Sequence, residues 1–124
     1  MKRLLILVTV IVSVHAILHG QDCTILSKAN NITPDKLCSP VTVTWNVIYN
    51  GVNNAGKSVS IRFRWGDGSS ETAPAVNIAG ASWQASVSHT YTSNGDKCNY
   101  NPQATLVVNG VECSSSTQQQ IVTV

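Results

Sequence analysis

An alternation of apolar and polar residues along most of the chain restricts the fold more than any other feature of the sequence. Mainly apolar side chains occupy every second position in four runs, which cover residues 41–49, 59–65, 81–91 and 104–108. Successive side chains of a β-strand point to opposite faces, so each run predicts a strand with one apolar face. A further strand is expected near 118–124. The best helical candidate after residue 20 is a single turn at 33–36.

Turn-forming residues separate these runs and favour an all-β fold. Asn109-Gly110 lies between two apolar stretches and predicts a two-residue type I′ hairpin. The segment 71–78 contains Pro74, which cannot donate a ladder hydrogen bond, and is predicted as one edge strand. About seven short antiparallel strands in about 100 residues fit an immunoglobulin-like β-sandwich. Its core is expected to hold the aromatic residues Trp45, Phe63, Trp65, Trp83 and Tyr91.

The N-terminal segment has the pattern of an export signal. A basic tip, Met1-Lys2-Arg3, precedes an apolar run over 4–18, with small residues at Ala16 and Gly20. This pattern predicts a signal peptide over 1–20 and cleavage after Ala16 or Gly20. A membrane span needs about 20 apolar residues, so a retained anchor is the less favoured alternative. Residues 21–124 are therefore expected to form one secreted or cell-surface domain, with no membrane insertion after cleavage.

The charge balance and histidine content exclude several classes of function. Six Asp and Glu residues stand against eight Lys and Arg, and two of the basic residues belong to the signal. A neutral domain has no electrostatic footprint for nucleic acid or for an anionic membrane. His89 is the only histidine after residue 20, which argues against histidine-based metal sites and catalytic triads. We expect no enzyme activity and no cofactor.

The four cysteines predict a disulfide framework. Cys23, Cys38, Cys98 and Cys113 would meet oxidising conditions in an exported domain and should pair. No C-x-x-C pair occurs, which argues against zinc and against a redox role. Four cysteines allow three connectivities.

Three motifs resemble those of PKD domains, which are immunoglobulin-like modules of bacterial secreted and surface proteins. The stretch Phe63-Arg64-Trp65-Gly66-Asp67-Gly68-Ser69 resembles their W-D-F-G-D-G-S signature, and His89-Thr90-Tyr91 matches their H-T-Y. The run 104–108 resembles their closing V-T-L-T-V strand, so the likeness covers 38–124. Arg64 replaces the family's first aspartate, and the stretch 97–103 is longer than usual. The chain thus resembles a divergent, disulfide-bearing PKD domain.

The resemblance implies a role without catalysis. PKD domains serve as spacers, adhesion modules or protein-interaction surfaces, in arrays or beside the catalytic domains of secreted hydrolases. Residues 21–124 are expected to be the N-terminal module of a longer protein, with neighbouring domains, surface proteins or glycans as partners. The alternative is an accessory carbohydrate-binding domain. A sugar platform needs aromatic residues on the polar face of a sheet, whereas the alternation places them on the apolar face.

The motif residues are expected to have structural roles. Gly66 and Gly68 suit the positive φ of a tight turn, where Asp67 can accept backbone hydrogen bonds. His89 shares the register of the apolar residues and should face inward. Some PKD domains bind calcium through loop carboxylates, but calcium needs several acidic ligands. The acidic residues here are spread over separate segments, so no metal site is predicted; the residue to test for calcium is Asp67, near Glu71 and apart from Asp22, Asp35 and Asp96.

Two arginines form a candidate contact surface. Arg62 and Arg64 fall on the polar face of their strand, either as a solvated face or as a contact for an acidic partner.

The hairpin and the strand order of such a sandwich decide between the disulfide connectivities. A regular Asn109-Gly110 hairpin places Cys113 opposite Leu106, about 26 Å from Cys98, too far for a disulfide. The strands after Cys38 and Cys98 start at one end of the sandwich, and those after Cys23 and Cys113 at the other. We therefore predict Cys38–Cys98 and Cys23–Cys113. The rival is Cys23–Cys38 with Cys98–Cys113, which requires an irregular hairpin.

Overall fold

The computed structural model describes residues 23, 25, 27–33, 40–52, 56–92 and 99–123. The predicted signal over 1–20, most of the 33–36 turn and two of the four cysteines, Cys38 and Cys98, lie outside these ranges. So do three of the carboxylates considered for calcium, Asp22, Asp35 and Asp96. Nothing in the described ranges is a helix with the length and apolar character needed to cross a membrane.

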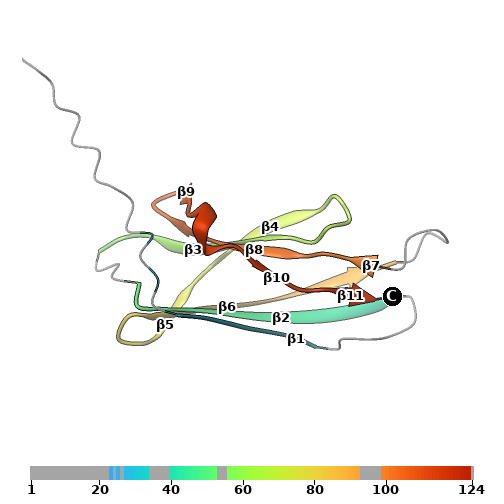
Figure 1. The fold of residues 1–124 in the computed structure, drawn as a ribbon, viewed down its shortest axis with the longest axis horizontal. Helices are drawn as coiled ribbons and strands as arrows, with labels where there is room; N and C mark the ends of the chain where they lie inside the picture. The colour runs from blue at the N-terminus through green and yellow to red at the C-terminus, as the bar shows by residue number, and fades with distance from the viewer. Residues whose placement is uncertain are drawn as a thin grey trace, which may run out of the picture.

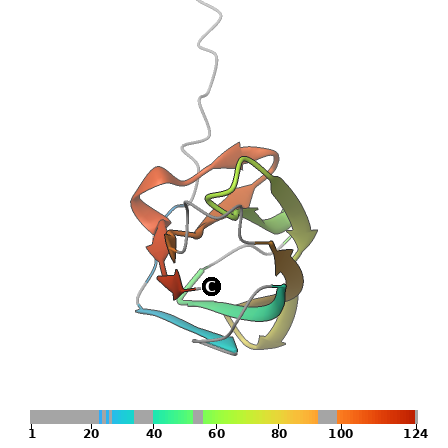
Figure 2. The same ribbon diagram turned by 90° about the vertical axis from the view of Figure 1, so that its right-hand side faces the viewer.

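The described residues form an all-β fold of antiparallel sheets, as predicted, consistent with an immunoglobulin-like sandwich. The first sheet has the order β1 (Ser27–Thr33), β2 (Val41–Asn50), β6 (Ser82–Tyr91) and β5 (Val76–Ala79). The second has the order β10 (Gln118–Gln119), β8 (Gln103–Val108), β3 (Val59–Arg64) and β4 (Ser70–Pro74), and β9 (Val111–Glu112) pairs with β8. A separate ladder joins β11 (Val122–Thr123) to β7 (Asn99–Tyr100), and a short 3₁₀ turn covers Ser114–Ser116. Figures 1 and 2 show the two main sheets as facing layers.

The core lies between the layers and is built by the predicted alternation. In β2 every second side chain from Val41 to Tyr49 is buried. Trp45 of this strand meets Phe63 of the opposite sheet edge-to-face at 5.6 Å between ring centroids, and Phe63 stacks on Trp65 at 5.7 Å. Trp65 is 1% exposed, which confirms its predicted burial, whereas Trp83 is only partly buried and packs at the margin of the core.

The segment predicted as a single edge strand over 71–78 is instead two edge strands, one in each sheet. β4 ends at Pro74, and Ala75 donates a backbone hydrogen bond to Val59 O at 3.0 Å. The chain then joins the other sheet, where Val76 pairs with Gln84. Proline lacks an N–H group and tends to end a ladder, so the strand stops there and a new pairing partner takes over.

The predicted final strand is also divided. Gln118 and Gln119 pair with β8, and Val122 and Thr123 pair with β7. Pro102 separates β7 from β8 on the partner side and offers only its carbonyl oxygen, which accepts from Gln120 N at 3.2 Å. The missing N–H group interrupts the ladder at this point.

The Asn109-Gly110 hairpin has the predicted two-residue form. Val108 pairs with Val111, and φ is 50° at Asn109 and 79° at Gly110, as a type I′ turn requires. The hairpin is regular as far as Cys113, whose N–H donates to Leu106 O at 2.8 Å.

Candidate functional site

The PKD-like motif residues form one packed cluster at the end of β3. The turn after Trp65 is closed by a hydrogen bond from Trp65 N to Ser69 O at 3.0 Å. Gly66 has a φ of 80°, and a Cβ there would lie 3.1 Å from Asn101 N. Glycine is therefore required at this position both by backbone conformation and by the close approach of the neighbouring chain.

Asp67 and His89 are joined within this cluster. His89 Nε2 donates to Asp67 Oδ2 at 2.7 Å, and the imidazole stacks on the Trp65 indole with 4.6 Å between centroids and planes 9° apart. Asp67 Oδ1 accepts from Ser69 N at 2.9 Å and from Ser69 Oγ at 2.5 Å. The predicted inward register of His89 thus places its ring over the core, with its polar edge on a carboxylate.

The hydrogen bonds set the protonation state of Asp67. Partial burial raises the pKa of its carboxyl, but the side-chain and backbone hydrogen bonds from Ser69, together with the bond and charge of His89, outweigh burial and lower the pKa from 3.8 to about 2. Asp67 is therefore ionised over the physiological range. An ionised carboxylate can only accept, so the proton of this pair is on His89 Nε2.

Tyr91 links Trp65 of the cluster to Tyr100 of β7. Its hydroxyl donates to Trp65 O at 2.8 Å, and its ring stacks on Tyr100 at 4.5 Å. Burial, and then the negative charge of Asp67, raise the pKa of the Tyr91 hydroxyl. Tyr91 is therefore a fixed, neutral hydrogen-bond donor.

This arrangement does not have the geometry of a nucleophilic triad. In such a triad the serine and the carboxylate bind different nitrogens of the histidine. Here Ser69 Oγ lies 3.5 Å from Nε2, the same atom that donates to Asp67, and the Ser69 hydroxyl itself donates to that carboxylate. Because Nε2 carries its proton toward Asp67, it cannot act as a base for Ser69.

The carboxylates near the motif are also engaged with protein groups. Both oxygens of Asp67 accept hydrogen bonds, and Glu71 Oε1 accepts from Trp65 Nε1 at 3.1 Å. Among the described residues, no group of three or more histidine, cysteine or acidic side chains could hold a metal ion. The calcium candidate Asp67 thus serves as a hydrogen-bond acceptor for its own turn and for His89.

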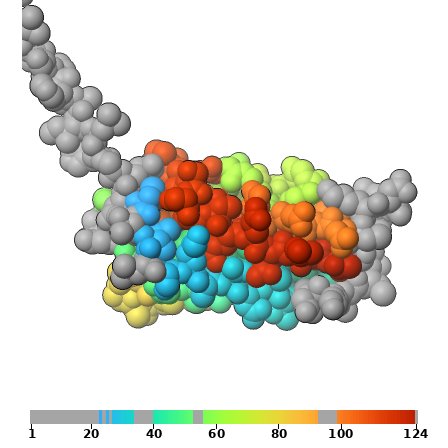
Figure 3. All heavy atoms as spheres, viewed as in Figure 1, coloured from blue at the N-terminus to red at the C-terminus, as the bar shows by residue number. Residues whose placement is uncertain are grey.

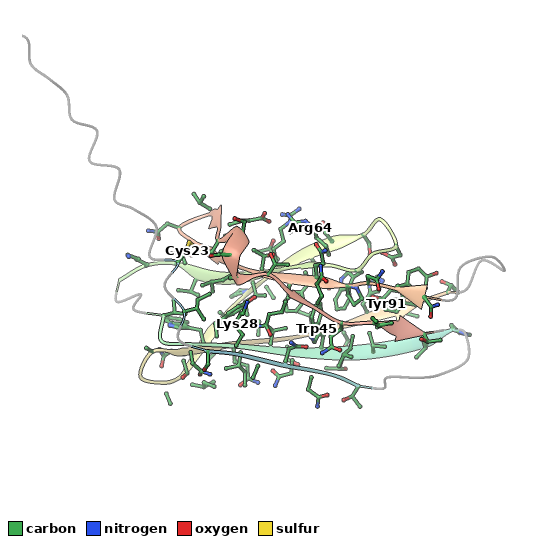
Figure 4. All side chains as sticks on the ribbon, viewed as in Figure 1. Cys23, Lys28, Trp45, Arg64 and Tyr91 are labelled. Atoms are coloured by element: carbon green, nitrogen blue, oxygen red, sulfur yellow. A yellow bond between two sulfur atoms is a disulfide. The ribbon has the colours of Figure 1, made fainter. Side chains whose placement is uncertain are left out.

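Arg62 and Arg64 lie on the outer face of the second sheet, and Arg64 is labelled there in Figure 4. Arg64 Nη2 donates to both oxygens of Glu112, at 2.6 and 2.8 Å. Arg62 Nε lies 3.4 Å from Glu112 Oε1 without hydrogen-bond alignment, and its Nη2 donates to Ser70 Oγ at 3.3 Å. One carboxylate against two guanidinium groups leaves a single net positive charge, so contact with an acidic partner stays a prediction.

The outer face of the first sheet carries neither charge nor aromatic rings on its three long strands. Its outward positions alternate with the inward ones and are Ser27, Ala29, Asn31 and Thr33 of β1, Thr42, Thr44, Asn46, Ile48 and Asn50 of β2, and Ser82, Gln84, Ser86, Ser88 and Thr90 of β6. Cross-strand hydrogen bonds join Thr42 to Thr90 at 2.7 Å and Thr44 to Ser88 at 2.8 Å. We call these positions the neutral face.

A polar network that the sequence did not predict joins the two sheets at one long side. Asn30 Nδ2 donates to Gln118 Oε1 at 2.7 Å, and Asn30 Oδ1 accepts from Trp45 Nε1 at 3.2 Å and from Gln120 Nε2. Figure 3 shows β1 and the last strands side by side along this surface. Asn30 faces inward because it is in register with buried Val47. The alternation of polar and apolar residues gave no signal for it, since an inward asparagine looks like a surface residue.

The cysteine pairing agrees with the prediction where the structure describes it. Cys23 and Cys113 form a disulfide with 5.5 Å between their Cα atoms. The rival connectivity is therefore wrong, because it assigns both cysteines to other partners. The predicted Cys38–Cys98 pair lies outside the described residues.

A scan of protein-family models and a search of curated proteins find no match to this chain.

Proposed function

We propose that residues 21–124 form a divergent PKD-like module that acts as a non-catalytic spacer or adhesion domain of a secreted or cell-surface protein. The observation that supports this most is how the motif residues are used. Trp65, Asp67, His89 and Tyr91 stack on and hydrogen-bond to one another. A catalytic or ligand-binding group usually has polar atoms directed into a cleft, whereas these side chains use theirs to fix a turn against the core.

The positions of the chain ends also support a spacer. Cys23 lies at one end of the long axis, as labelled in Figure 4, and β11 lies at the opposite end in Figure 1. A domain entered at one end and left at the other can be joined end to end with neighbours. Neighbouring domains of the same polypeptide are thus the first partners that we propose.

The second candidate function is an accessory carbohydrate-binding domain, and the neutral face favours it. Its hydroxyl and amide groups could hydrogen-bond an uncharged polyhydroxylated ligand, although the aromatic residues of β2 and β6 all lie in the inward register and none is on this face.

A glycan array probed with the exported chain separates the two functions. A spacer should give no signal above background. Signal that is lost in Thr44→Lys, which places a charge in the neutral face, but kept in the control Thr72→Lys, on the exposed strand β4 of the other sheet, would contradict the spacer and support carbohydrate binding.

Export itself is tested by intact mass. We expect protein recovered from the culture medium to lack the first 16 to 20 residues, because the basic tip and apolar run should be cleaved at Ala16 or Gly20. A mature mass that includes Met1 would instead indicate a retained anchor.

The Asp67–His89 pair predicts how stability depends on pH. Folding lowers the pKa of Asp67 from 3.8 to about 2, so its stabilisation is complete above about pH 4 and is lost as the pH falls toward about 2. Asp67 lies at the surface, where solvent screens the effect, and we expect a loss of about 1 kcal/mol. Urea unfolding from about pH 4 to about pH 2 measures it, and Asp67→Asn should lose less over that range. Equal losses in both proteins would show that other groups dominate.

A further inference from the structure

The Cys23–Cys113 disulfide lies at the end of the sandwich opposite to β11. Cys113 follows the Asn109-Gly110 hairpin and bonds to Leu106, whereas Val122 pairs with Tyr100 beyond the other end of β8. The segment 113–123 therefore runs along the length of the domain, as the red strands in Figures 1 and 3 show.

This placement shortens the covalent path through the domain. Without the disulfide, the backbone from Cys23 to Thr123 passes through 100 residue-to-residue links; the bridge joins Cys23 to Cys113 and leaves only the 10 links of 113–123. We propose that the module is a load-bearing tether in which the Cys23–Cys113 disulfide carries tension past residues 24–112. The proposal rests on the proposed spacer role for its biological meaning.

The loaded segment is held along its whole length. Ser116 Oγ accepts from Leu106 N at 2.8 Å, Thr117 Oγ1 lies 3.0 Å from Thr105 Oγ1, and Gln118 pairs with Ala104 in the β8 ladder. Val122 is 1% exposed at the far end. Tension directed along this segment acts on these contacts in parallel rather than opening them one by one. Contacts loaded in parallel share the force, so the segment should resist detachment.

The bypassed part of the domain is the part that contains most of the core. Trp45, Phe63, Trp65 and Tyr91 all lie between residues 24 and 112. None of them is on the covalent path between Cys23 and Thr123 while the bridge is intact. The core can therefore stay folded under a load that would otherwise pull its strands apart.

The two paths differ about ninefold in length. A fully extended chain spans at most about 3.6 Å per residue, so 100 links reach about 360 Å, whereas the 10 links of 113–123 reach about 36 Å and the bridge adds the 5.5 Å between its Cα atoms. The oxidised module should be almost inextensible, and the reduced module should extend by many times its folded length.

Single-molecule force spectroscopy on the exported chain tests this inference. Handles are placed between Gly20 and Gln21 and after Val124, and intact mass establishes that the cysteines are oxidised. We expect oxidised molecules to present a contour between Cys23 and Thr123 of no more than about 42 Å, which is the 10 links plus the 5.5 Å across the bridge, and the same protein in a thiol reductant to present about 360 Å. Oxidised molecules that release the long contour, or reduced ones that release only the short contour, would overturn the proposal.

A variant separates this bridge from the other cysteines. Cys23→Ala with Cys113→Ala should release at least about three times the oxidised contour, because a Cys38–Cys98 bridge could withhold at most 60 of the 100 links and the other 40 reach about 144 Å. A variant that releases no more than the oxidised protein would contradict the bypass. Force spectroscopy measures only which part of the chain carries the tension. A protein that shows the expected contours and also binds a glycan would therefore contradict the spacer role and leave the tether proposal standing.

Discussion

Trp65→Ala is expected to lower the free energy of unfolding by about 3–5 kcal/mol, the usual cost of removing a large buried aromatic side chain. Trp65 is 1% exposed and contacts Trp45, Phe63, His89 and Tyr91 through its ring. Its loss would leave a cavity between the sheets and would also remove the surface on which the His89 ring stacks. Urea unfolding followed by circular dichroism measures the change.

Trp83→Ala is the matched control for this substitution. Trp83 is only partly buried, at the margin of the core, and its Nε1 donates to Val52 O at 3.3 Å. We expect a smaller loss than for Trp65→Ala, by at least about 1 kcal/mol, because less apolar surface returns to water. Equal losses for the two variants would mean that the motif tryptophan has no special place in the core.

Removal of the Cys23–Cys113 bridge should have a comparable effect on stability. The bridge closes a loop with a sequence separation of 90 residues, for which the chain-entropy model gives about 4 to 5 kcal/mol. Cys23→Ala with Cys113→Ala is the appropriate variant, because alanine does not bury a hydroxyl group at position 113, where the cysteine is 1% exposed. Unfolding in urea without reductant compares it with the oxidised protein. A loss below about 1 kcal/mol would show that the bridge adds little to equilibrium stability.

The strands that the sequence predicts well are those whose inward face packs on the opposite sheet. β2, β3 and β6 show the alternation because their inward residues meet the opposite sheet. β1 shows little alternation, since it is the edge strand of the first sheet, where Lys28 is exposed and Asn30 turns inward to polar partners. The division of the segment over 71–78 depended on which sheet each residue pairs with, and this is decided by the rest of the fold.

The sequence predicted where the residues of the candidate site lie, but not which hydrogen bonds join them. The sequence placed Asp67 in a tight turn and His89 on the inward face, but their mutual hydrogen bond depends on the spacing of β3 and β6 in space. The Cys23–Cys113 pair could be predicted because the hairpin and the direction of the strands constrain it. The engagement of Arg64 by Glu112 could not, since it joins residues 48 apart in sequence on β3 and β9, which lie on either side of β8.

The two long sides of the sandwich are closed in different ways, and this determines where the structure opens first. At one side the backbone itself crosses between the sheets at Ala75, so the sheets cannot separate there without moving a continuous chain. At the other side, among the described residues, side-chain hydrogen bonds of Asn30, Gln118 and Gln120 join the sheets along β1, and the Cys23–Cys113 disulfide fastens them near the start of that strand. Local opening should therefore begin at the Asn30 side and hinge about Ala75. Backbone amides of β1 and β10 would then exchange with solvent hydrogen sooner than those of β3 and β6.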